Sequence, residues 1–385
     1  MRAIPFLCLF LVLQSAPQTA SAQQPAASLP PVPAAPAVPA RGYILVDFNS
    51  GEVLAEKDAD APMDPASITK LMTAYAVFSE LRKGQMSLED IVTVSERAWR
   101  TGGSRTFIEV GTSVGVEDLI RGMIIQSGND ASVALAEHTA GTEAAFAELM
   151  NEYAQRLGMH NTKFRNSTGL PAEDHYSSAR DIAILASAII REYPEFYQFY
   201  SEREFTFNNI TQRNRNQMLW RDPTVDGMKT GMTDAAGYCL VSSAQRDGMR
   251  LISVLLGTSS TKARADATQS LLNWGFRFYE SHRLYAAGEA VTKARLWKGE
   301  LEMMDLGLSE DLWVTVPRGR YDLMDASLEL QSPLVAPLAV TDAVGRIRIS
   351  LDGRVLAERA LHPLADSAEG GFARRALHSV LLWFE

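Results

Sequence analysis

The sequence contains little cysteine. Cys8 and Cys239 are the two cysteines of the chain, and Cys8 lies in an N-terminal segment that has the form of a removable leader. Without that leader Cys239 is the one remaining thiol, which excludes an intramolecular disulfide. The mature protein must therefore keep its fold in an exported location without a covalent cross-link.

The N-terminal region also lacks an apolar run long enough to cross a bilayer. The run from Ile4 to Leu13 is well short of the about 20 residues that a spanning helix needs. Met1-Arg2 precedes this run and Ala20-Ser21-Ala22 follows it, which is the pattern of a secretory signal, residues 1–22, cleaved after Ala22. We therefore expect an exported protein rather than one held by an N-terminal membrane span.

An excess of basic charge is absent as well. The whole chain has 37 basic and 46 acidic residues. Loss of Arg2 with the signal leaves 36 basic against 46 acidic residues, a formal charge of −10. No broad basic region is visible, so nucleic acid is not an expected partner. A hydrophobic content of 46% over 385 residues is ample for a core and favours two folded units over one.

Composition and periodicity divide the chain into segments. Residues 23–41 consist mostly of Ala, Pro, Gln and Val and predict a flexible or semi-extended linker. Residues 43–55 predict a strand, a tight turn at Asn49-Ser50-Gly51 and a second strand. Helical spacing of apolar residues follows in several segments, and strands return before a last helix. The helical segments are 65–81, 117–139, 143–157, 178–191 and 263–279, and the returning strands are 237–244 and 250–256.

Strands at both ends with helices between them indicate a mixed α/β (α+β) domain over residues 42–280, in which helices cover an antiparallel sheet. Residues 281–366 predict a small all-β domain, with strands at 295–297, 312–316 and 326–331. Its clearest element is a hairpin of 346–351 and 354–357 across Asp352-Gly353. This region shows no nucleophile and base pairing and no metal-ligand spacing, so we expect a spacer or docking module.

Ser67 and Lys70 form a Ser-x-x-Lys pair at the predicted start of a helix. Asp64 is an N-cap type of residue and Pro65 suits the first helical position, which places Ser67 in the first turn. Residues three apart share a helix face, so the amine can reach the hydroxyl. Lysine can act as a base only if its pKa falls by a few units from about 10.4, and burial near other cations could cause that fall. In isolation the pair is weak, because most such matches are solvated helix residues.

Two further polar segments are equally ambiguous when taken singly. Residues 126–131, which contain Ser127 and Asn129, interrupt two helical patterns and could be a capped helix-helix connection. Residues 225–231 contain Lys229, Thr230 and Gly231. Glycine there lets a ligand approach the backbone, and the cation and hydroxyl suit a carboxylate. The same segment could also be an edge strand with a solvated lysine.

The order of the three segments is more informative than any one of them. Ser-x-x-Lys, Ser-x-Asn and Lys-Thr-Gly begin at residues 67, 127 and 229, which is the motif set of penicillin-binding proteins and class A β-lactamases. With their flanking residues, 66–73, 123–131 and 225–231 resemble the D-alanyl-D-alanine carboxypeptidases of the low-molecular-mass penicillin-binding protein class. The resemblance covers about residues 42–279, and the rest more loosely. It implies a β-lactamase/transpeptidase-like fold for the first domain.

The resemblance also implies an activity and a role for each motif residue. The enzyme would remove the terminal D-alanine of peptidoglycan stem pentapeptides and bind β-lactam antibiotics covalently, without a metal or other cofactor. Ser67 would form the acyl-enzyme, Lys70 would take its proton, and Ser127 would relay a proton to the leaving D-alanine. Asn129 would hold the substrate amide and help to fix Lys70.

The remaining assignments concern the substrate carboxylate and the oxyanion. Lys229 and Thr230, followed by Gly231, would bind the terminal carboxylate, with Arg264 as a second cation. The backbone N–H groups of Ser67 and Met232 would form the oxyanion hole. Many relatives have His at the position of Met232, so the resemblance does not predict the substrate preference or the pH response of this protein. Arg215 lies in a segment, 214–220, that matches a family segment near the site, and a structural role for it is equally open.

Three alternatives to this interpretation were weighed. Gly111-Thr112-Ser113-Val114-Gly115 fits the nucleophile elbow of α/β-hydrolases. Ser113 precedes Glu117-Asp118, however, so we expect a helix cap there instead. A β-lactamase would carry a Glu-x-x-Leu-Asn segment between Ser127 and Lys229, and none is found, which predicts stable penicillin adducts. The third alternative is a wall-binding protein with an inactive site.

The C-terminal residues 370–385 predict an amphipathic helix. Phe372, Ala376, Val380 and Phe384 recur at every fourth position, and Arg374, Arg375, His378 and Ser379 lie opposite them. Such a helix is too short to cross the ~30 Å hydrocarbon core and would lie in the membrane interface. We therefore expect a peripheral protein on the periplasmic face of the inner membrane, with a helix docked on the β domain as the alternative.

Overall fold

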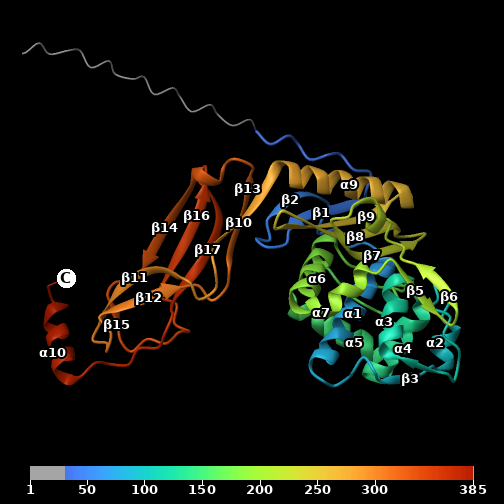
Figure 1. Ribbon diagram of the computed structural model, residues 1–385, viewed down its shortest axis with the longest axis horizontal. Coiled ribbons are helices and arrows are strands. Elements are labelled where there is room, and N and C mark those ends of the chain that lie inside the picture. Colours follow the sequence, from blue (N-terminus) through green and yellow to red (C-terminus); the bar gives the residue numbers. More distant parts are fainter. Residues whose placement is uncertain (1–30, 385) are drawn as a thin grey trace, which may run out of the picture. The chain divides into compact units, whose positions relative to one another are not determined.

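The structure is a computed structural model that describes residues 31–384. The expected signal, 1–22, and the first part of the expected linker lie outside the described residues. Figure 1 shows a part built on a sheet with helices, followed by a part made mainly of strands. The predicted fold class, a mixed α/β domain followed by a small β domain, is confirmed.

The first domain is built on a five-stranded antiparallel sheet. Its strand order is β2-β1-β9-β8-β7, so the two N-terminal strands lie beside three strands that come much later in the chain. The predicted hairpin forms β1 and β2, and the strands predicted near 237–244 and 250–256 form β8 and β9. The strand bounds are β1 Gly42–Asp47, β2 Val53–Lys57, β7 Val225–Thr233, β8 Gly237–Arg246 and β9 Met249–Thr258.

Both faces of this sheet are covered, because alternate residues of each strand point to opposite sides. Ile44 and Val254 pack into a core with the helical cluster, while Leu45 and Leu255 pack against the long helix α9, Thr261–Phe278. Burial on both faces explains why these strands have nearly continuous apolar sequences. The helices of the cluster are α1 Lys70–Arg82, α3 Val116–Ile125, α4 Asn129–Ala140, α5 Glu143–Arg156 and α6 Ala179–Glu192.

Shorter elements connect these helices and strands. A single 3-10 turn, η1 (Ala66–Thr69), leads directly into α1. β5 and β6 form a small hairpin, and β3 and β4, which are separated in sequence by α2, form a small two-stranded antiparallel sheet. The bounds are β3 Ile91–Thr93, β4 Ser113–Gly115, β5 Glu204–Phe207, β6 Ile210–Arg213, α2 Glu96–Arg100, α7 Pro194–Tyr197, η2 Gln198–Ser201 and α8 Met218–Arg221.

The second domain is almost entirely β structure. β10 pairs with β13, and a six-stranded sheet has the order β14-β16-β17-β12-β11-β15. The predicted hairpin across Asp352-Gly353 is confirmed as β16 and β17, while β10 and β12 were not predicted from the sequence. The bounds are β10 Tyr279–Tyr285, β11 Ala290–Trp297, β12 Met303–Gly307, β13 Leu312–Pro317, η3 Tyr321–Leu323, β14 Met324–Leu330, β15 Leu334–Val335, β16 Gly345–Leu351 and β17 Arg354–Pro363.

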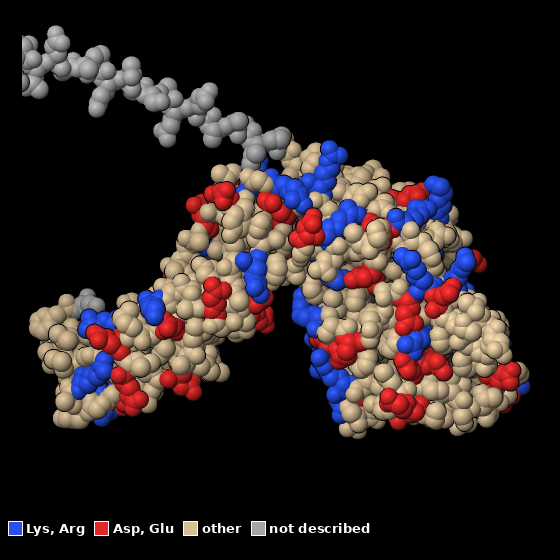
Figure 2. All heavy atoms as spheres, viewed as in Figure 1, with Lys and Arg blue, Asp and Glu red and all other residues tan. Residues whose placement is uncertain are grey.

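Acidic and basic side chains are interspersed on the face of the molecule drawn in Figure 2. Within the second domain, charged side chains pair across neighbouring strands. Arg346 Nε lies 2.6 Å from Glu329 Oε2, and Arg348 Nε lies 2.8 Å from Glu358 Oε2. Exposed pairs of this kind contribute little to stability, but they place polar groups on the outer face of an antiparallel sheet.

The chain ends in the short helix α10, Phe372–Leu381. Its polar side contacts the β domain: His378 is 8% exposed, its Nδ1 accepts a hydrogen bond from Lys298 N at 2.8 Å, and its ring lies on Trp297. Its apolar side is open to solvent, since Phe372 is 81% and Val380 60% exposed. Among the described residues no helix is both long and apolar enough to cross a membrane.

Three local expectations differ from the structure. Residues 32–41 were expected in a flexible or semi-extended linker; 32–40 contain no helix or strand, but the segment is not flexible in the sense expected, since Val32 and Val38 pack against the α9 core and Trp274 Nε1 donates to Pro33 O. Asp64 does not cap the helix of Ser67, because that turn is a 3-10 turn with Pro65 at the cap position. Ser113 is not a cap either: it is an exposed residue of β4, and Gly115 precedes α3.

Candidate active site

The predicted nucleophile and base are adjacent in the structure. Ser67 lies in η1 and Lys70 is the first residue of α1, and Lys70 Nζ lies 3.0 Å from Ser67 Oγ. Ser67 is partly exposed, whereas Lys70 is 1% exposed. The hydroxyl therefore faces a cavity while the amine approaches it from inside the protein.

The surroundings of Lys70 favour the neutral amine. Burial lowers the pKa of Lys70 from its ordinary value of 10.5 to about 7, and Arg215 lowers it further, while Asp130 and Glu143 act in the opposite direction. The amine also lies 2.7 Å from Asn129 Oδ1 and 2.6 Å from Thr168 O. Two acceptors can bind the two hydrogens of a neutral amine, which leaves its lone pair for the hydroxyl of Ser67.

The turn between α3 and α4 brings the Ser-x-Asn pair to the same place. Ser127 has a positive φ of 66° and is 2% exposed, and its Oγ has no hydrogen-bond partner within residues 31–384. A buried hydroxyl without a partner costs free energy, which is expected where a substrate supplies the missing bond. Asn129 Nδ2 donates to Gly102 O at 2.7 Å, so its side chain is held between the loop at 102 and Lys70.

The buried carboxylate of Asp130 fixes the neighbouring loop. It is 0% exposed and accepts hydrogen bonds from the backbone N atoms of Thr106 (2.8 Å) and Phe107 (2.9 Å). The loop it holds includes Gly103 and Ser104, which line the cavity. Asp130, the acidic residue after the Ser-x-Asn motif, therefore holds the loop in place and does not line the cavity.

The third motif forms the opposite wall on β7, the edge strand of the sheet. Thr230, Gly231 and Met232 line the cavity, and Met232 is 53% exposed. Lys229 is 2% exposed and lies behind this wall rather than on it, with its Nζ donating to Thr230 O. Burial lowers the pKa of Lys229 well below its ordinary value, and Lys70, Arg215 and Arg264 act in the same direction. The alternative interpretation, a solvated lysine on an edge strand, is therefore right about the edge strand and wrong about the lysine, which is buried.

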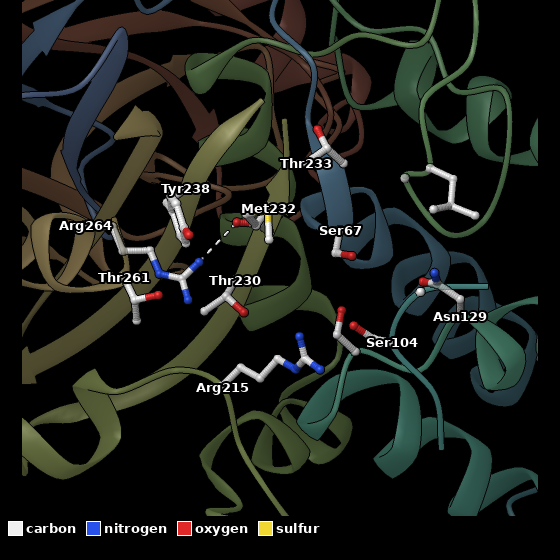
Figure 3. Close-up of a pocket in the computed structure, with 15 residues that line it drawn as sticks. Ser67, Ser104, Asn129, Arg215, Thr230, Met232, Thr233, Tyr238, Thr261 and Arg264 are labelled. Atoms are coloured by element: carbon white, nitrogen blue, oxygen red, sulfur yellow. Dashed lines mark hydrogen bonds between the residues drawn. The ribbon is translucent and has the colours of Figure 1, made fainter. Parts of the chain in front are cut away.

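Two arginines add positive charge to the cavity. Arg264, from α9, donates through Nη1 to Gly231 O and Cys239 O at 3.1 Å each, and so braces β7 against β8. Arg215 is exposed and also lines the cavity. Figure 3 shows Arg264 and Thr230 on one side of the cavity and Ser67, Ser104 and Asn129 on the other. Positive charge and hydroxyl donors at one end suit a substrate carboxylate.

The cavity measures about 600 Å³, a size suited to a short peptide or small molecule. Several lining residues were not predicted from the sequence, because they lie in loops, at the start of α9 and at the facing ends of β7 and β8, outside the three motifs. They are Gly103, Ser104, Gly169, Leu170, Thr233, Tyr238 and Thr261. No Asp or Glu is among the lining residues of the described chain.

Gly169 lets the loop of residues 166–170 pack against the nucleophile turn. It has φ +80°, and a β-carbon on it would lie 1.8 Å from Ala66 O. We expect Gly169→Ala to lower the free energy of unfolding and to slow acylation by a fluorescent penicillin. Gly141→Ala is the control, since Gly141 has φ +77° with nothing within 4 Å. In the control, backbone strain should lower the free energy of unfolding by only about 1–2 kcal/mol. In Gly169→Ala the contact with Ala66 should lower it by about 1–3 kcal/mol more.

Denaturant unfolding of both variants, followed by acylation rates of the folded proteins, measures this difference. Equal losses in the two variants would show that the contact with Ala66 is unimportant.

This geometry suits a serine acyl-transfer enzyme with a lysine base, and comparison with known proteins gives the family of the chain. A family model described as D-alanyl-D-alanine carboxypeptidase matches residues 30–260, and one described as the C-terminal domain of penicillin-binding protein 5 matches residues 279–369. The chain belongs to the D-alanyl-D-alanine carboxypeptidase family.

Individual proteins that are similar to this chain support the same family. D-alanyl-D-alanine carboxypeptidase DacA of Escherichia coli (strain K12) is 44% identical over 353 residues, which cover 90% of this chain and 88% of the relative. The crystal structure of penicillin-binding protein 5 from Haemophilus influenzae matches with a TM-score of 0.84 and 42% identity, covering 87% of this chain and 99% of that one. Penicillin-binding protein D2 from Listeria monocytogenes, in its ampicillin-bound form, matches with a TM-score of 0.59 and 30% identity, covering 63% and 100%.

Proposed function

We propose that this D-alanyl-D-alanine carboxypeptidase acts on peptidoglycan stem pentapeptides through an acyl-enzyme at Ser67. The observation that carries the proposal is the 3.0 Å contact between Lys70 Nζ and Ser67 Oγ, made by a buried lysine whose pKa is lowered to about 7. Neutral Lys70 takes the hydroxyl proton as Ser67 Oγ attacks the carbonyl carbon of the penultimate D-alanine.

The leaving group then needs a proton. The tetrahedral intermediate collapses with cleavage of the C–N bond, and the amine of the terminal D-alanine takes up a proton. The hydroxyl of Ser127, which has no partner of its own within the described chain, relays that proton from Lys70. Water then attacks the Ser67 ester, which releases the shortened peptide as a carboxylate and restores the serine hydroxyl.

The wall on β7 binds and orients the substrate. Thr230 and Arg264 hold the terminal carboxylate, with Lys229 adding positive charge from behind the wall and Arg215 from the rim. The backbone N–H groups of Ser67 and Met232 stabilise the oxyanion, and Asn129 binds the substrate amide. Gly231 keeps the wall close to the nucleophile, because a β-carbon there would lie 3.2 Å from Ala66 Cβ.

β-Lactams acylate the same serine in this proposal. The absence of a carboxylate among the cavity-lining residues that the structure describes leaves no general base of the β-lactamase kind, so the penicillin ester at Ser67 is long-lived. Intact-protein mass spectrometry after penicillin treatment measures this directly. Rapid turnover of penicillin without a lasting adduct would favour a β-lactamase.

The decisive experiment is D-alanine release from a peptidoglycan pentapeptide by the protein without residues 1–22. Release that is blocked by prior penicillin treatment supports the carboxypeptidase. Penicillin labelling of Ser67 without release would indicate hydrolysis of crosslinks or a binding role.

We also propose that the protein is exported and lies at the outer surface of the inner membrane through α10. The support is the orientation of that helix: its polar side is held by the β domain, and the exposed apolar side includes Phe372, Leu377 and Val380. An apolar face of this kind can enter the interfacial region of a bilayer.

Deletion of residues 372–385 is expected to release the protein from membranes while D-alanine release is kept. A second variant, Leu377→Glu with Val380→Glu, changes exposed positions and leaves the contacts of His378 in place, so it should also release the protein. Ser379→Ala, on the polar side, serves as the control and should stay bound. Co-sedimentation of the deleted protein with lipid vesicles would contradict the proposal.

A further inference from the structure

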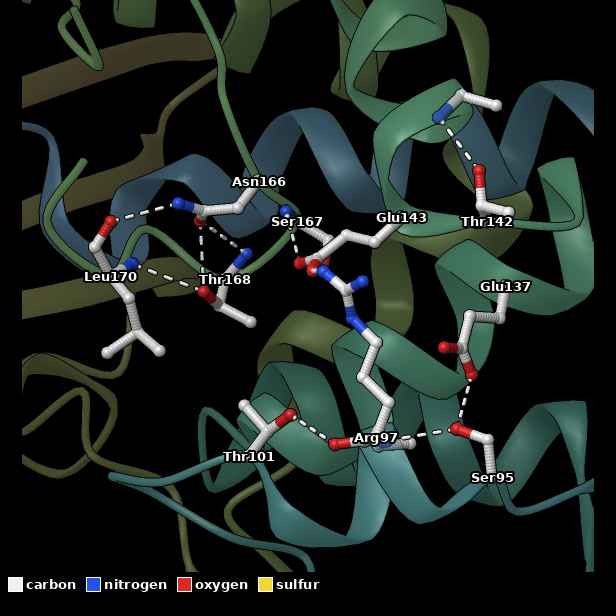
Figure 4. A network of polar contacts seen from close by, with 12 residues as sticks. Ser95, Arg97, Thr101, Glu137, Thr142, Glu143, Asn166, Ser167, Thr168 and Leu170 are labelled. Carbon is white, nitrogen blue, oxygen red and sulfur yellow. Dashed lines mark hydrogen bonds and ion pairs between the residues drawn. The ribbon is translucent and has the colours of Figure 1, made fainter. Parts of the chain in front are cut away.

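Glu143 is a buried carboxylate that contacts the loop beside the catalytic lysine without lining the cavity. It is the first residue of α5, and its side chain is 9% exposed. Oε1 accepts hydrogen bonds from Ser167 N at 3.1 Å and Ser167 Oγ at 2.8 Å, and Oε2 accepts one from Arg97 Nη2 at 2.6 Å. Figure 4 shows the carboxylate between the loop and Arg97. Glu143 therefore ties α2 to residues 166–170.

The same loop provides an acceptor for the lysine. Ser167 O accepts from Thr73 Oγ1 at 2.7 Å, and the next carbonyl, Thr168 O, accepts from Lys70 Nζ at 2.6 Å. Lys70 and Thr73 are three residues apart on α1 and share one face of it. Because the two carbonyls are consecutive, a displacement of Ser167 also moves the acceptor of the lysine.

The inner side of the loop is held by its own residues. Asn166 Oδ1 accepts from Thr168 N at 3.1 Å and from Gly169 N at 2.7 Å, and its Nδ2 donates to Leu170 O. These bonds keep the turn compact but do not attach it to the helical cluster. Apart from the bond from Lys70 itself, the loop is attached to the helical cluster by Thr73 on one side and by Glu143 on the other.

We propose that Glu143 is a positioning residue for Lys70: through Ser167 it fixes the carbonyl of Thr168, and thereby the direction of the lysine amine. The proposal rests on the proposed roles of Ser67 and Lys70. Glu143 touches neither the substrate nor the reacting atoms. Its effect on catalysis is transmitted by the loop and by its charge.

The charge of Glu143 gives this role a distinctive signature. Besides burial, the charges that act on the pKa of Lys70 are Arg215, which lowers it, and Asp130 and Glu143, which raise it. Removal of the Glu143 charge therefore lowers the pKa of Lys70 further. The lysine acts as a base in its neutral form, so the acidic limb of the rate profile moves to lower pH.

The test compares Glu143→Gln, Glu143→Ala and Glu137→Gln in the full mature chain. The control is matched, because Glu137 also accepts a hydrogen bond from a serine, Ser95 Oγ at 2.6 Å, but does not contact the loop. The measurement is the second-order rate of Ser67 acylation by a fluorescent penicillin as a function of pH. Thermal unfolding reports how much of each variant is folded.

We expect Glu143→Ala to have a maximal acylation rate about 10- to 100-fold lower, because the loop acceptor is misplaced, and an acidic limb at lower pH, because the same charge is lost. Glu143→Gln keeps an acceptor for Ser167, so its maximal rate should remain near the wild-type value while its acidic limb shifts to lower pH. Glu137→Gln should change neither the rate nor the limb.

Wild-type rates and an unshifted profile in both Glu143 variants would overturn the proposal, as would an equal loss in Glu137→Gln. If Glu143→Ala does not fold, the profile of Glu143→Gln decides, together with Ser167→Ala, which removes one of the two bonds to Glu143 and should lower the rate. Failure of the proposed function is recognised separately, since the wild-type protein would then form no adduct at Ser67, and the inference would fall with it.

Discussion

Ser67→Ala is expected to abolish both penicillin labelling and D-alanine release. Ser67 is the residue whose Oγ meets the buried amine of Lys70 at 3.0 Å, so its loss removes the atom that forms the ester. Removal of the nucleophile from an acyl-transfer site lowers kcat by a factor of the order of 10⁴ to 10⁶. The fold should be retained, because a partly exposed hydroxyl is replaced by a hydrogen.

Ser113→Ala is the matched control for this prediction. Ser113 belongs to the rival Gly-x-Ser-x-Gly motif, yet it lies exposed on β4, a short strand that pairs with β3. It should keep full labelling and full activity. Loss of labelling in Ser113→Ala, with labelling retained in Ser67→Ala, would move the nucleophile to the other motif.

Lys70→Met is expected to lower the acylation rate by about 10²- to 10⁴-fold, the usual contribution of a general base. Methionine keeps much of the buried volume but cannot accept a proton. In the wild type, the rate should rise with pH as Lys70 loses its proton, with a midpoint near its pKa of about 7. In Lys70→Met this limb should be absent.

A rate measurement between pH 5 and 9 on stable folded protein separates these cases. Lys163→Met is the control, because Lys163 pairs with Asp174 on the surface and should leave the profile unchanged. If Lys70→Met kept the wild-type dependence of the acylation rate on pH, a group other than Lys70 would be responsible for that dependence. Asn129, which lies 2.7 Å from the amine, would lose its partner in this variant but provides no base.

The sequence predicted which motif residues lie together better than it predicted the loops that complete the cavity. Ser67 and Lys70 could be paired because helical spacing fixes which side chains share a face, and the Ser-x-Asn and Lys-Thr-Gly segments were recognised by their order along the chain. Thr168 could not be predicted, since its contribution is a backbone carbonyl in a loop. Ser104 and Tyr238 are likewise brought to the cavity by tertiary packing that no local pattern encodes.

The fold class was also predictable, for a related reason. The spacing of apolar residues, alternate in strands and every third or fourth in helices, indicates which side chains are buried. Burial of those side chains stabilises the main strands and helices of this chain. The wrong predictions concern polar or proline-rich segments whose structure is set by packing against distant parts of the chain. Residues 32–41 looked like a flexible or semi-extended linker but pack against α9, and Ser113 looked like a cap but pairs in a strand. Lys229 would be solvated on an ordinary edge strand and is instead buried behind the cavity wall.

The position of β7 at the edge of its sheet has a consequence for association between molecules. An open edge can pair with any extended chain, including the sheet edge of another copy of the same protein. Here the edge faces η1 across a cavity of about 600 Å³, which admits a short peptide but not the border of another folded sheet. The walls that select a peptide also shield the strand from self-aggregation.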